Sequence, residues 1–306
     1  MKSEPTLNPY LALFFGVIAV STSAILVKLA GAPAAVIATY RLLFTVLLMV
    51  PVIVWKHWRD ISQISSRDWL LSALSGIFLA FHFILWFESL NYTSVASSVV
   101  LVTLQPLFSF AGAYFFFKEK VSRLGVLGGV IALAGSAVIG WGDFKIGGAA
   151  LWGDILALAG AGMVTGYWLF GQSVRQRLSL MPYTFVVYGI SVVTLLIYDF
   201  ITGDSLYPYD MRNWYVFLAL AIFPTLLGHS VFNWVIKWLS ANIISMSILG
   251  EPVGSSILAY FILKEKVTQI QFIGGMVILI GIYLFIKWNR PKVNEIGKAE
   301  SLEIQG

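Results

Sequence analysis

The sequence contains no cysteine and very little charge. Because cysteine is absent from all 306 residues, neither a disulfide framework nor a thiolate metal site is possible. Only 11% of the residues are charged, whereas a soluble domain carries about 25%. A chain with 58% hydrophobic residues and so few charges cannot cover its own surface in water. A water-soluble globular fold is therefore excluded, and the remaining solvent is lipid.

Long, continuous apolar runs fill most of the chain. A membrane-spanning helix needs about 20 apolar residues, so ~30 residues for each span with its connection predict roughly ten spans. We place them at about 10–30, 34–54, 69–90, 94–117, 124–141, 152–172, 183–202, 214–236, 241–263 and 270–288. The sequence therefore predicts an all-α integral membrane protein with ten transmembrane helices.

The lysine and arginine residues outside these spans are distributed unequally. Fourteen lie on the side that carries the N-terminus and four lie on the other side. By the positive-inside rule, both termini are predicted to be cytoplasmic, in a multi-pass protein of the cell membrane. This asymmetry explains the net charge of +5, so no nucleic-acid partner is expected. Residues 289–306 are predicted to form a polar cytoplasmic tail.

A second copy of one segment lies 146 residues downstream. Residues 105–135, which begin QPLFSFAGAYFFFKEKV, align with residues 251–281, which begin EPVGSSILAYFILKEKV. The two segments share 13 identities in 31 positions without a gap, including the KEKV run and a pattern of glycines. Shared apolar composition does not produce a charged motif and a glycine pattern in register, so the chain contains an internal duplication.

The repeat shift covers five predicted spans. Because five is an odd number, the two copies cross the membrane in opposite directions, as in many secondary transporters. The predicted repeats are residues 8–141, with spans 1–5, and residues 152–288, with spans 6–10. Pro106 and Pro252 occupy equivalent mid-helix positions, where each removes a backbone hydrogen bond, so we predict a helix kink at each.

Several motifs resemble those of the drug/metabolite transporter superfamily. They are Gly153–Asp154 at the start of span 6, the GEPV run at residues 250–253, and two KEK turns that each precede a helix with paired glycines. Over residues 8–288 the chain is most similar to the ten-span EamA family. The resemblance implies two inverted five-helix repeats around a central cavity lined mainly by spans 1, 3, 4, 6, 8 and 9.

The resemblance also implies an activity, because members of this family mostly export amino acids and related metabolites. We expect a secondary active transporter that works by alternating access on a small-molecule substrate in the lipid bilayer, as a monomer or homodimer and without a cofactor. The sequence has no GxxxxGK[ST] phosphate loop, so the energy comes from the substrate gradient or from a coupled ion such as a proton. One alternative is a flippase or a transporter of lipid-linked or drug-like amphiphiles. Another, a membrane enzyme, is disfavoured by the short and mostly basic loops.

Polar residues within the apolar runs are the candidate translocation site. A charged group at the centre of a span costs about 2.5–3.5 kcal/mol, so it normally faces protein or a water-filled cavity. Glu251 lies near the predicted midplane of span 9. It either binds a substrate ammonium group or a coupled proton, or holds the kink at Pro252 through a hydrogen bond. Its repeat equivalent is Gln105, so only one half carries a carboxyl group.

Two histidines occupy similar predicted depths in opposite halves. His229 and Asn233 follow one face of span 8, and His82 and Trp86 follow one face of span 3. Each of these residues either lines the cavity or makes an interhelical hydrogen bond. Trp168 is one of several aromatic residues that either stack on a substrate or pack. The sequence has no HExxH motif and no carboxylate at ligand spacing, so no metal site is expected.

Four charged residues fall in the outer half of the predicted bilayer. They are Lys28, Arg41, Glu88 and Asp154. Arg41 lies roughly two turns inside span 2 and is the strongest candidate among them for a role in translocation. The four residues form either a charged gate that opens during transport or a static salt-bridge cluster that locks the helices together.

Overall fold

A computed structural model describes residues 5–93, 95–141, 148–262, 264 and 267–289. Within these ranges every regular element is a helix, and nine helical segments are long and apolar enough to cross a membrane. A tenth apolar helix, Arg123–Ile139, is shorter. The predicted all-α membrane fold is thereby confirmed. Beyond Asn289, the predicted polar tail lies outside the described residues.

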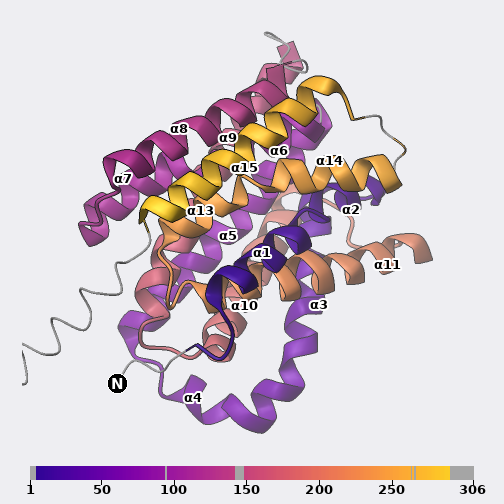
Figure 1. The fold of residues 1–306 in the computed structure, drawn as a ribbon. Helices are drawn as coiled ribbons and strands as arrows, with labels where there is room; N and C mark the ends of the chain where they lie inside the picture. Colours follow the sequence, from indigo (N-terminus) through magenta and orange to yellow (C-terminus); the bar gives the residue numbers. More distant parts are fainter. Residues whose placement is uncertain (1–4, 94, 142–147, 263, 265–266, 290–306) are drawn as a thin grey trace, which may run out of the picture.

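The ten spans follow one another in chain order (Figure 1). Span 1 consists of α1 (Pro9–Val20) and α2 (Ser23–Leu29), and span 3 is α5 (Ser66–Tyr92). Span 2 consists of α3 (Ala34–Val52), which continues through a π-helical turn, η1 (Ile53–His57), into α4 (Trp58–Ser62). Span 4 consists of α6 (Val95–Val102) and α7 (Gln105–Phe117), while spans 5, 6 and 7 are α8 (Arg123–Trp141), α9 (Gly148–Val174) and α10 (Leu180–Thr202). Span 8 consists of α11 (Met211–Leu220), the π-helical η2 (Ala221–His229) and α12 (Ser230–Val235). Span 9 consists of α13 (Ala241–Ile248) and α14 (Glu251–Ile262), and span 10 is α15 (Gln269–Asn289).

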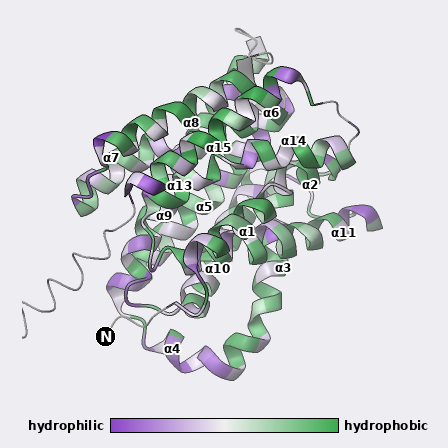
Figure 2. Cartoon of the chain, in the orientation of Figure 1, coloured by the Kyte–Doolittle hydropathy of each residue, from purple (hydrophilic) through white to green (hydrophobic). Residues whose placement is uncertain are grey.

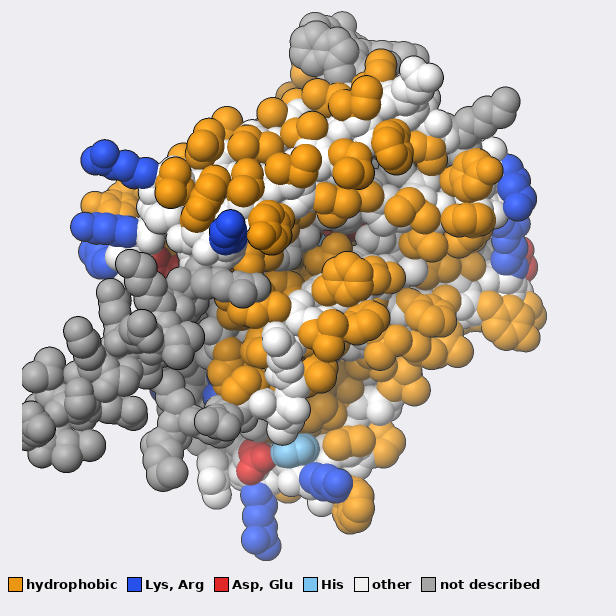
Figure 3. Space-filling model, in the orientation of Figure 1, with side chains coloured by type: hydrophobic (Ala, Val, Ile, Leu, Met, Phe, Trp, Pro, Cys, Tyr) orange, Lys and Arg blue, Asp and Glu red, His pale blue; other side chains and the backbone are white. Residues whose placement is uncertain are grey.

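Apolar side chains cover much of the outside of this bundle. Large side chains such as Phe116, Phe200 and Phe272 are mostly exposed. Hydrophobic residues run along nearly the whole length of the visible helices (Figure 2), and lysine and arginine gather at the edges of the space-filling view (Figure 3). A helix that is apolar all round is stable only when its outer face meets lipid. The exposed apolar band therefore faces the hydrocarbon.

The two ends of the bundle carry different connections. One end holds the turn after α7, the segment between α9 and α10, and the end of α15, where the Ser122 backbone N–H donates to Asn289 Oδ1 at 3.0 Å. We call this end the Lys118 face. The other end holds the segment between α10 and α11, which contains Asp204, and the segment after α2, where the Gly31 N–H donates to Asn213 Oδ1 at 2.7 Å. We call this end the Asp204 face.

Spans of one repeat pack mainly against spans of the other. Span 1 packs on span 8, span 2 on span 7, span 3 on span 6, span 4 on spans 6 and 9, and span 5 on span 10. In Figure 1, α8 and α15 lie side by side along their length. The two halves are therefore interleaved, and the contact between them forms the interior of the protein.

Glycine contacts between α8 and α15 reveal a pseudo-twofold axis. A Cβ on Gly128 would lie 2.6 Å from the backbone nitrogen of Phe285, and a Cβ on Gly274 would lie 2.7 Å from the Ile139 side chain. Adding 146 to residues 128 and 139 gives residues 274 and 285, so one contact is the image of the other. The helices approach this closely because only glycine leaves the space. The duplication read from the sequence is therefore also a structural symmetry.

Candidate functional site

Six spans surround a central cavity inside the bundle. Each contributes two lining residues: Val20 and Ser23, His82 and Trp86, Val102 and Gln105, Val164 and Trp168, His229 and Phe232, and Ile248 and Glu251. These residues come from spans 1, 3, 4, 6, 8 and 9, the set that the family resemblance implies. The cavity volume is about 20 Å³, which is room for one water molecule. The central site is thus contracted in this conformation.

The cavity lies on the pseudo-twofold axis. Three pairs of lining residues are related by the shift of 146 residues: Trp86/Phe232, Val102/Ile248 and Gln105/Glu251. Phe83 and His229 form a further pair of this kind, and their ring centroids lie 5.4 Å apart. An axis that relates the two halves must pass between the members of such a contact. Both repeats therefore contribute to the site in nearly equivalent ways.

Interrupted helices bring Gln105 and Glu251 to the cavity. Gln105 is the first residue of α7 and Glu251 is the first residue of α14, and a proline follows each. Proline is tolerated in the first turn because the backbone N–H that it lacks would have no helical acceptor there. Pro106 and Pro252 therefore begin a new helix after a break, whereas the sequence predicted a kink within a continuous helix.

Five lining side chains carry a buried polar atom with no hydrogen-bond partner among the described residues. These atoms are Trp86 Nε1, Gln105 Oε1, Trp168 Nε1, His229 Nδ1 and Glu251 Oε1. Buried polar atoms are normally paired, because an unmade hydrogen bond costs about 1–3 kcal/mol. Two of the atoms are donors and at least two are acceptors, so the cavity suits a solute that offers both kinds of group.

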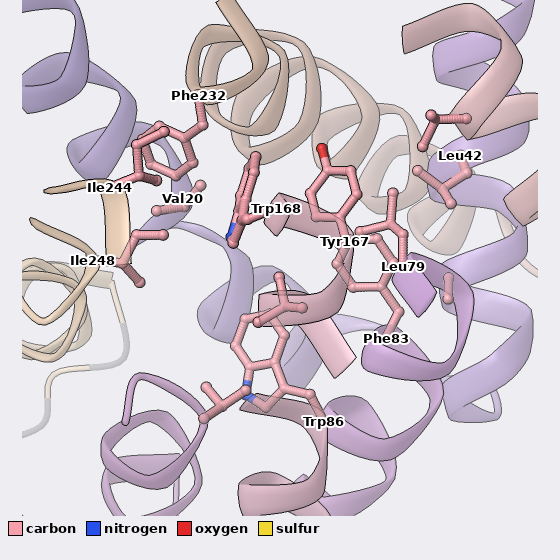
Figure 4. Close-up of a cluster of buried hydrophobic side chains, with 14 of the residues drawn as sticks. Val20, Leu42, Leu79, Phe83, Trp86, Tyr167, Trp168, Phe232, Ile244 and Ile248 are labelled. Carbon is pink, nitrogen blue, oxygen red and sulfur yellow. The ribbon is translucent and has the colours of Figure 1, made fainter. Parts of the chain in front are cut away.

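Stacked aromatic rings form the walls of the cavity. His82 stacks on Trp86 with a centroid distance of 5.6 Å, and His229 stacks on Trp168 at 5.7 Å. The backbone carbonyl of Gly160 accepts a hydrogen bond of 3.0 Å from His82 Nδ1, which fixes the orientation of that ring. Figure 4 shows Trp86 and Trp168 on one side of a common space, with Val20 and Ile248 opposite Trp168. The walls are therefore aromatic and amphipathic.

Arg41 lies behind the cavity and does not line it. Its guanidinium group is fully buried, donates to Thr225 Oγ1 at 2.7 Å and to Ser23 Oγ at 2.8 Å, and lies 4.2 Å from the centroid of the Phe83 ring. Its Nη2 has no hydrogen-bond partner among the described residues. Arg41 and Glu251 interact electrostatically without forming an ion pair. Arg41 thus bridges spans 1, 2 and 8 and adds a positive charge next to the site.

The other three charged residues of the outer half have separate partners. Lys28 Nζ donates to the Leu90 carbonyl at 2.7 Å, and Asp154 Oδ1 accepts from Ser97 at 2.9 Å. Glu88 accepts a hydrogen bond from Asn91, three residues further along α5. Among the described residues none of these groups pairs with another or with Arg41, so they form no single cluster.

Asn233 does not reach the cavity. Its side-chain amide nitrogen donates to Tyr167 Oη at 2.5 Å and to Tyr188 Oη at 3.3 Å, and its backbone carbonyl accepts from Arg175 Nε at 2.8 Å. Burial lowers the pKa of Arg175 to about 10, so this residue stays positively charged at neutral pH. These bonds join spans 6, 7 and 8, and Asn233 therefore has a packing role.

The π-helical segment η2 interrupts the regular pattern that was predicted for span 8. Pro224 lacks the N–H of a regular helix, and Thr225 Oγ1 donates instead to the Leu220 carbonyl five residues back, at 2.8 Å. A π-helix has a wider turn than an α-helix, so a face drawn at four-residue intervals is not kept through η2. From the end of η2 onwards, His229 and Phe232 are the residues of span 8 that line the cavity. A simple helical pattern therefore placed Asn233 on the wrong side.

A larger pocket opens on the Lys118 face, next to the central cavity. Its volume is about 390 Å³, and its lining includes Glu119, Gln172, Ile236, Lys237 and Ile243. Trp168 lines the central cavity and Gln172, four residues further along α9, lines the pocket. Phe232 and Ile236 have the same relation on span 8. Four residues correspond to about 6 Å of helix. A barrier of about one helical turn therefore separates the two spaces.

Side-chain hydrogen bonds join the two halves at the floor of this pocket. Glu119, just after α7, accepts from Gln172 Nε2 at 2.6 Å and from Asn242 Nδ2 at 3.2 Å. Asn242 Oδ1 accepts from Ser109 Oγ at 2.7 Å, and Gln172 Oε1 accepts from the Ala241 N–H at 2.7 Å. We call this network the Glu119 latch. Sequence analysis used the KEKV motif only as a marker of the repeat and did not assign these residues a role.

The described residues contain no group of three His, Cys, Asp or Glu side chains that could hold a metal ion. His82 and His229 are 6.4 Å apart between ring centroids, and Glu251 is the one carboxyl group among the residues that line the cavity. The site is therefore built from hydrogen-bonding groups, aromatic rings and one carboxyl group.

Comparisons with known proteins agree with this architecture. The profile of the EamA-like transporter family matches residues 7–141 and 151–287. The uncharacterized transporter YxxF of Bacillus subtilis is 25% identical over 247 residues, covering 78% of this chain and 76% of that protein, and YdfC of the same organism is 24% identical over 266 residues, covering 85% and 84%. A protein crystal structure with 20% identity superposes with a TM-score of 0.72 over 90% of this chain and 95% of that one, which shows a shared fold. The chain belongs to the EamA-like transporter family of the drug/metabolite transporter superfamily, and it is a transporter and not an enzyme.

Proposed function

We propose that this protein is a secondary active transporter that exports amino acids or related small metabolites across the cell membrane by alternating access. Its two moving halves are the repeats of residues 8–141 and 152–288. The observation that carries the proposal is the set of five unpartnered polar atoms in a cavity on the pseudo-twofold axis. A small zwitterion offers both donors and acceptors to such a site, and a site shared by inverted repeats can open to either side.

The Lys118 face is proposed to be cytoplasmic. It carries most of the lysine and arginine residues outside the spans, which supports this orientation by the positive-inside rule. The pocket of about 390 Å³ on that face serves as the entrance from the cell interior. Substrate passes the one-turn barrier when the central cavity widens, because a volume of about 20 Å³ does not hold an amino acid.

Counterflow in proteoliposomes tests the proposal. Vesicles that contain the purified protein and a high internal concentration of unlabelled amino acid should accumulate the same labelled amino acid, whereas empty vesicles should not. A panel of apolar, polar, acidic and basic amino acids identifies the accepted class. If no amino acid or related metabolite exchanges while the protein is monodisperse and correctly inserted, the proposed substrate class is wrong.

Proton coupling through Glu251 is a separate expectation. Glu251 is the one acidic residue among the lining residues, so we propose that it alternates between a proton and the substrate. An imposed pH gradient is then expected to drive uphill substrate movement in the wild type, and Glu251→Gln should retain no response to the gradient. If substrate accumulates to the same extent with and without the pH gradient, proton coupling is excluded.

Weakening the Glu119 latch is expected to open the Lys118 face. Glu119→Ala removes the acceptor of two hydrogen bonds between the halves, each worth about 1.5–3 kcal/mol when a charged group takes part. Because the chain has no cysteine, a single cysteine at Ile243 reports access to this pocket. Its maleimide labelling rate should rise at least about tenfold, the equivalent of one of these bonds. Lys120→Ala, in the same turn, is the control, and equal labelling of the two variants would contradict a latch.

A second candidate function is movement of lipid-like or drug-like amphiphiles. A lipid-facing groove of about 460 Å³ is lined by Arg67, Phe78, Phe108, Phe116, Thr165 and Phe170, among others. Thr165 Oγ1 lies 3.5 Å from the carbonyl of Gln105, so the groove reaches the wall of the central cavity. Fluorescent-lipid scrambling in the same proteoliposomes distinguishes this function from amino-acid exchange.

A further inference from the structure

The central cavity presents a carboxyl group from one half and a carboxamide from the other, at symmetry-related positions. Gln105 and Glu251 each begin a half-helix, and their residues are 3% and 5% exposed. Each has one side-chain oxygen without a hydrogen-bond partner among the described residues. A solute group that contacts Glu251 from one half therefore has an equivalent position beside Gln105 in the other half.

Few charges surround this pair. Glu251 is the only acidic residue among the described lining residues, and the lining contains no lysine or arginine. Arg41, the nearest cation, lies behind Ser23, and its side chain donates to Ser23 Oγ and Thr225 Oγ1. A second ammonium group on a substrate would thus be buried beside Gln105 without a negative partner. Burying an unpaired charge in this way is strongly unfavourable.

We propose that Gln105 contacts the substrate and that its neutral amide limits the cavity to substrates with a single positively charged group. The inference rests on the proposed function and specifies which amino acids the site accepts. Because positions 105 and 251 are related by the axis, a carboxyl group at either position should be able to bind the ammonium group of the substrate. Gln105 is then a specificity-determining residue, and Glu251 supplies the single negative charge from the opposite half.

Transport of norleucine and lysine tests this inference, because lysine has the same carbon chain as norleucine and carries one added ammonium group on its terminal carbon. The wild type should prefer norleucine. Gln105→Glu should shift the lysine-to-norleucine transport ratio towards lysine by about tenfold or more, the effect of one ion pair or charged hydrogen bond. Gln105→Met is the uncharged control, which should weaken norleucine transport without changing that ratio.

Moving the carboxyl group from position 251 to position 105 is the more decisive part of the experiment. Glu251→Gln alone should lose norleucine transport, and Gln105→Glu combined with Glu251→Gln should recover a substantial part of it. The inference is overturned if the double variant is as inactive as Glu251→Gln, or if Gln105→Glu leaves the transport ratio unchanged, while both elute as monodisperse protein. If Gln105→Glu does not fold, Gln105→Met decides, because unchanged norleucine transport would exclude contact with the substrate. If the wild type moves neither amino acid, this inference falls, and if it also moves no other member of the counterflow panel, the proposed function fails with it.

Discussion

Arg41→Met is expected to leave the protein at least as stable as the wild type while transport falls about tenfold or more, the equivalent of roughly 1.4 kcal/mol in the barrier. Arg41 is fully buried, has no ion-pair partner among the described residues and leaves Nη2 without a hydrogen bond. Replacing a poorly paired buried charge with an apolar side chain of similar size is often neutral or stabilising by about 1–4 kcal/mol. Transport should fall because the guanidinium group positions Ser23 and acts electrostatically on Glu251.

Two measurements on the same preparations separate these effects. Thermal unfolding in detergent reports stability, and counterflow per folded molecule reports transport. Arg41→Lys is the control, because it keeps the charge but loses the two-armed contact with Ser23 and Thr225. A clear fall in the unfolding temperature, with transport reduced only in proportion to the folded protein, would show that Arg41 is purely structural.

Gly281→Ala, in contrast to Arg41→Met, is expected to be strongly destabilising, because the structure leaves no space for an added Cβ at this position. The new Cβ would lie 2.4 Å from the backbone nitrogen of Ala132 and 2.7 Å from its Cα. Backbone atoms cannot rotate away, so α8 and α15 would have to move apart, each away from the pseudo-twofold axis between them. Overpacking of a well-packed contact costs about 1–3 kcal/mol or more.

Gly189→Ala is the matched control on α10, since a Cβ there meets nothing within 4 Å. Alanine is the better helix former by about 1 kcal/mol, so this variant should be as stable as the wild type or more stable. Gly135→Ala, the repeat equivalent of Gly281→Ala, should behave like Gly281→Ala, because its Cβ would lie 2.7 Å from the Ile278 nitrogen. Equal unfolding temperatures for Gly281→Ala and Gly189→Ala would contradict the tight axial contact.

The number of spans, the duplication and five lining residues of the cavity could be predicted from the sequence. Continuous apolar runs report burial in lipid directly, and the repeat register places Gln105 opposite Glu251 without any knowledge of packing. His82, Trp86 and His229 were predicted from their depth within the apolar runs, and the structure places them around the same space.

What the sequence did not reveal depends on contacts between distant segments. Residues at the breaks before Gln105 and Glu251, such as Thr103 and Leu249, are fully buried by other segments, and a local pattern contains no trace of those segments. Asn233 was misplaced because His229 shares the cavity wall with Phe232, while Asn233 bonds to tyrosines of spans 6 and 7 that no local pattern reveals. Trp168 could not be distinguished from the many packing aromatics of the apolar runs, although it forms one wall of the cavity.

The interleaving of the repeats also constrains how the protein is made. The first five spans leave the ribosome before any of their partners from the second repeat exist. The glycines of α8 pack against α15, which has 21 residues and is the last helix of the described chain. Insertion and assembly are therefore separate events, and the helices of the first half stay in the bilayer without their main partners until the second half is made. A nascent chain that stops short of α15 would present this bare surface to the quality-control machinery of the membrane.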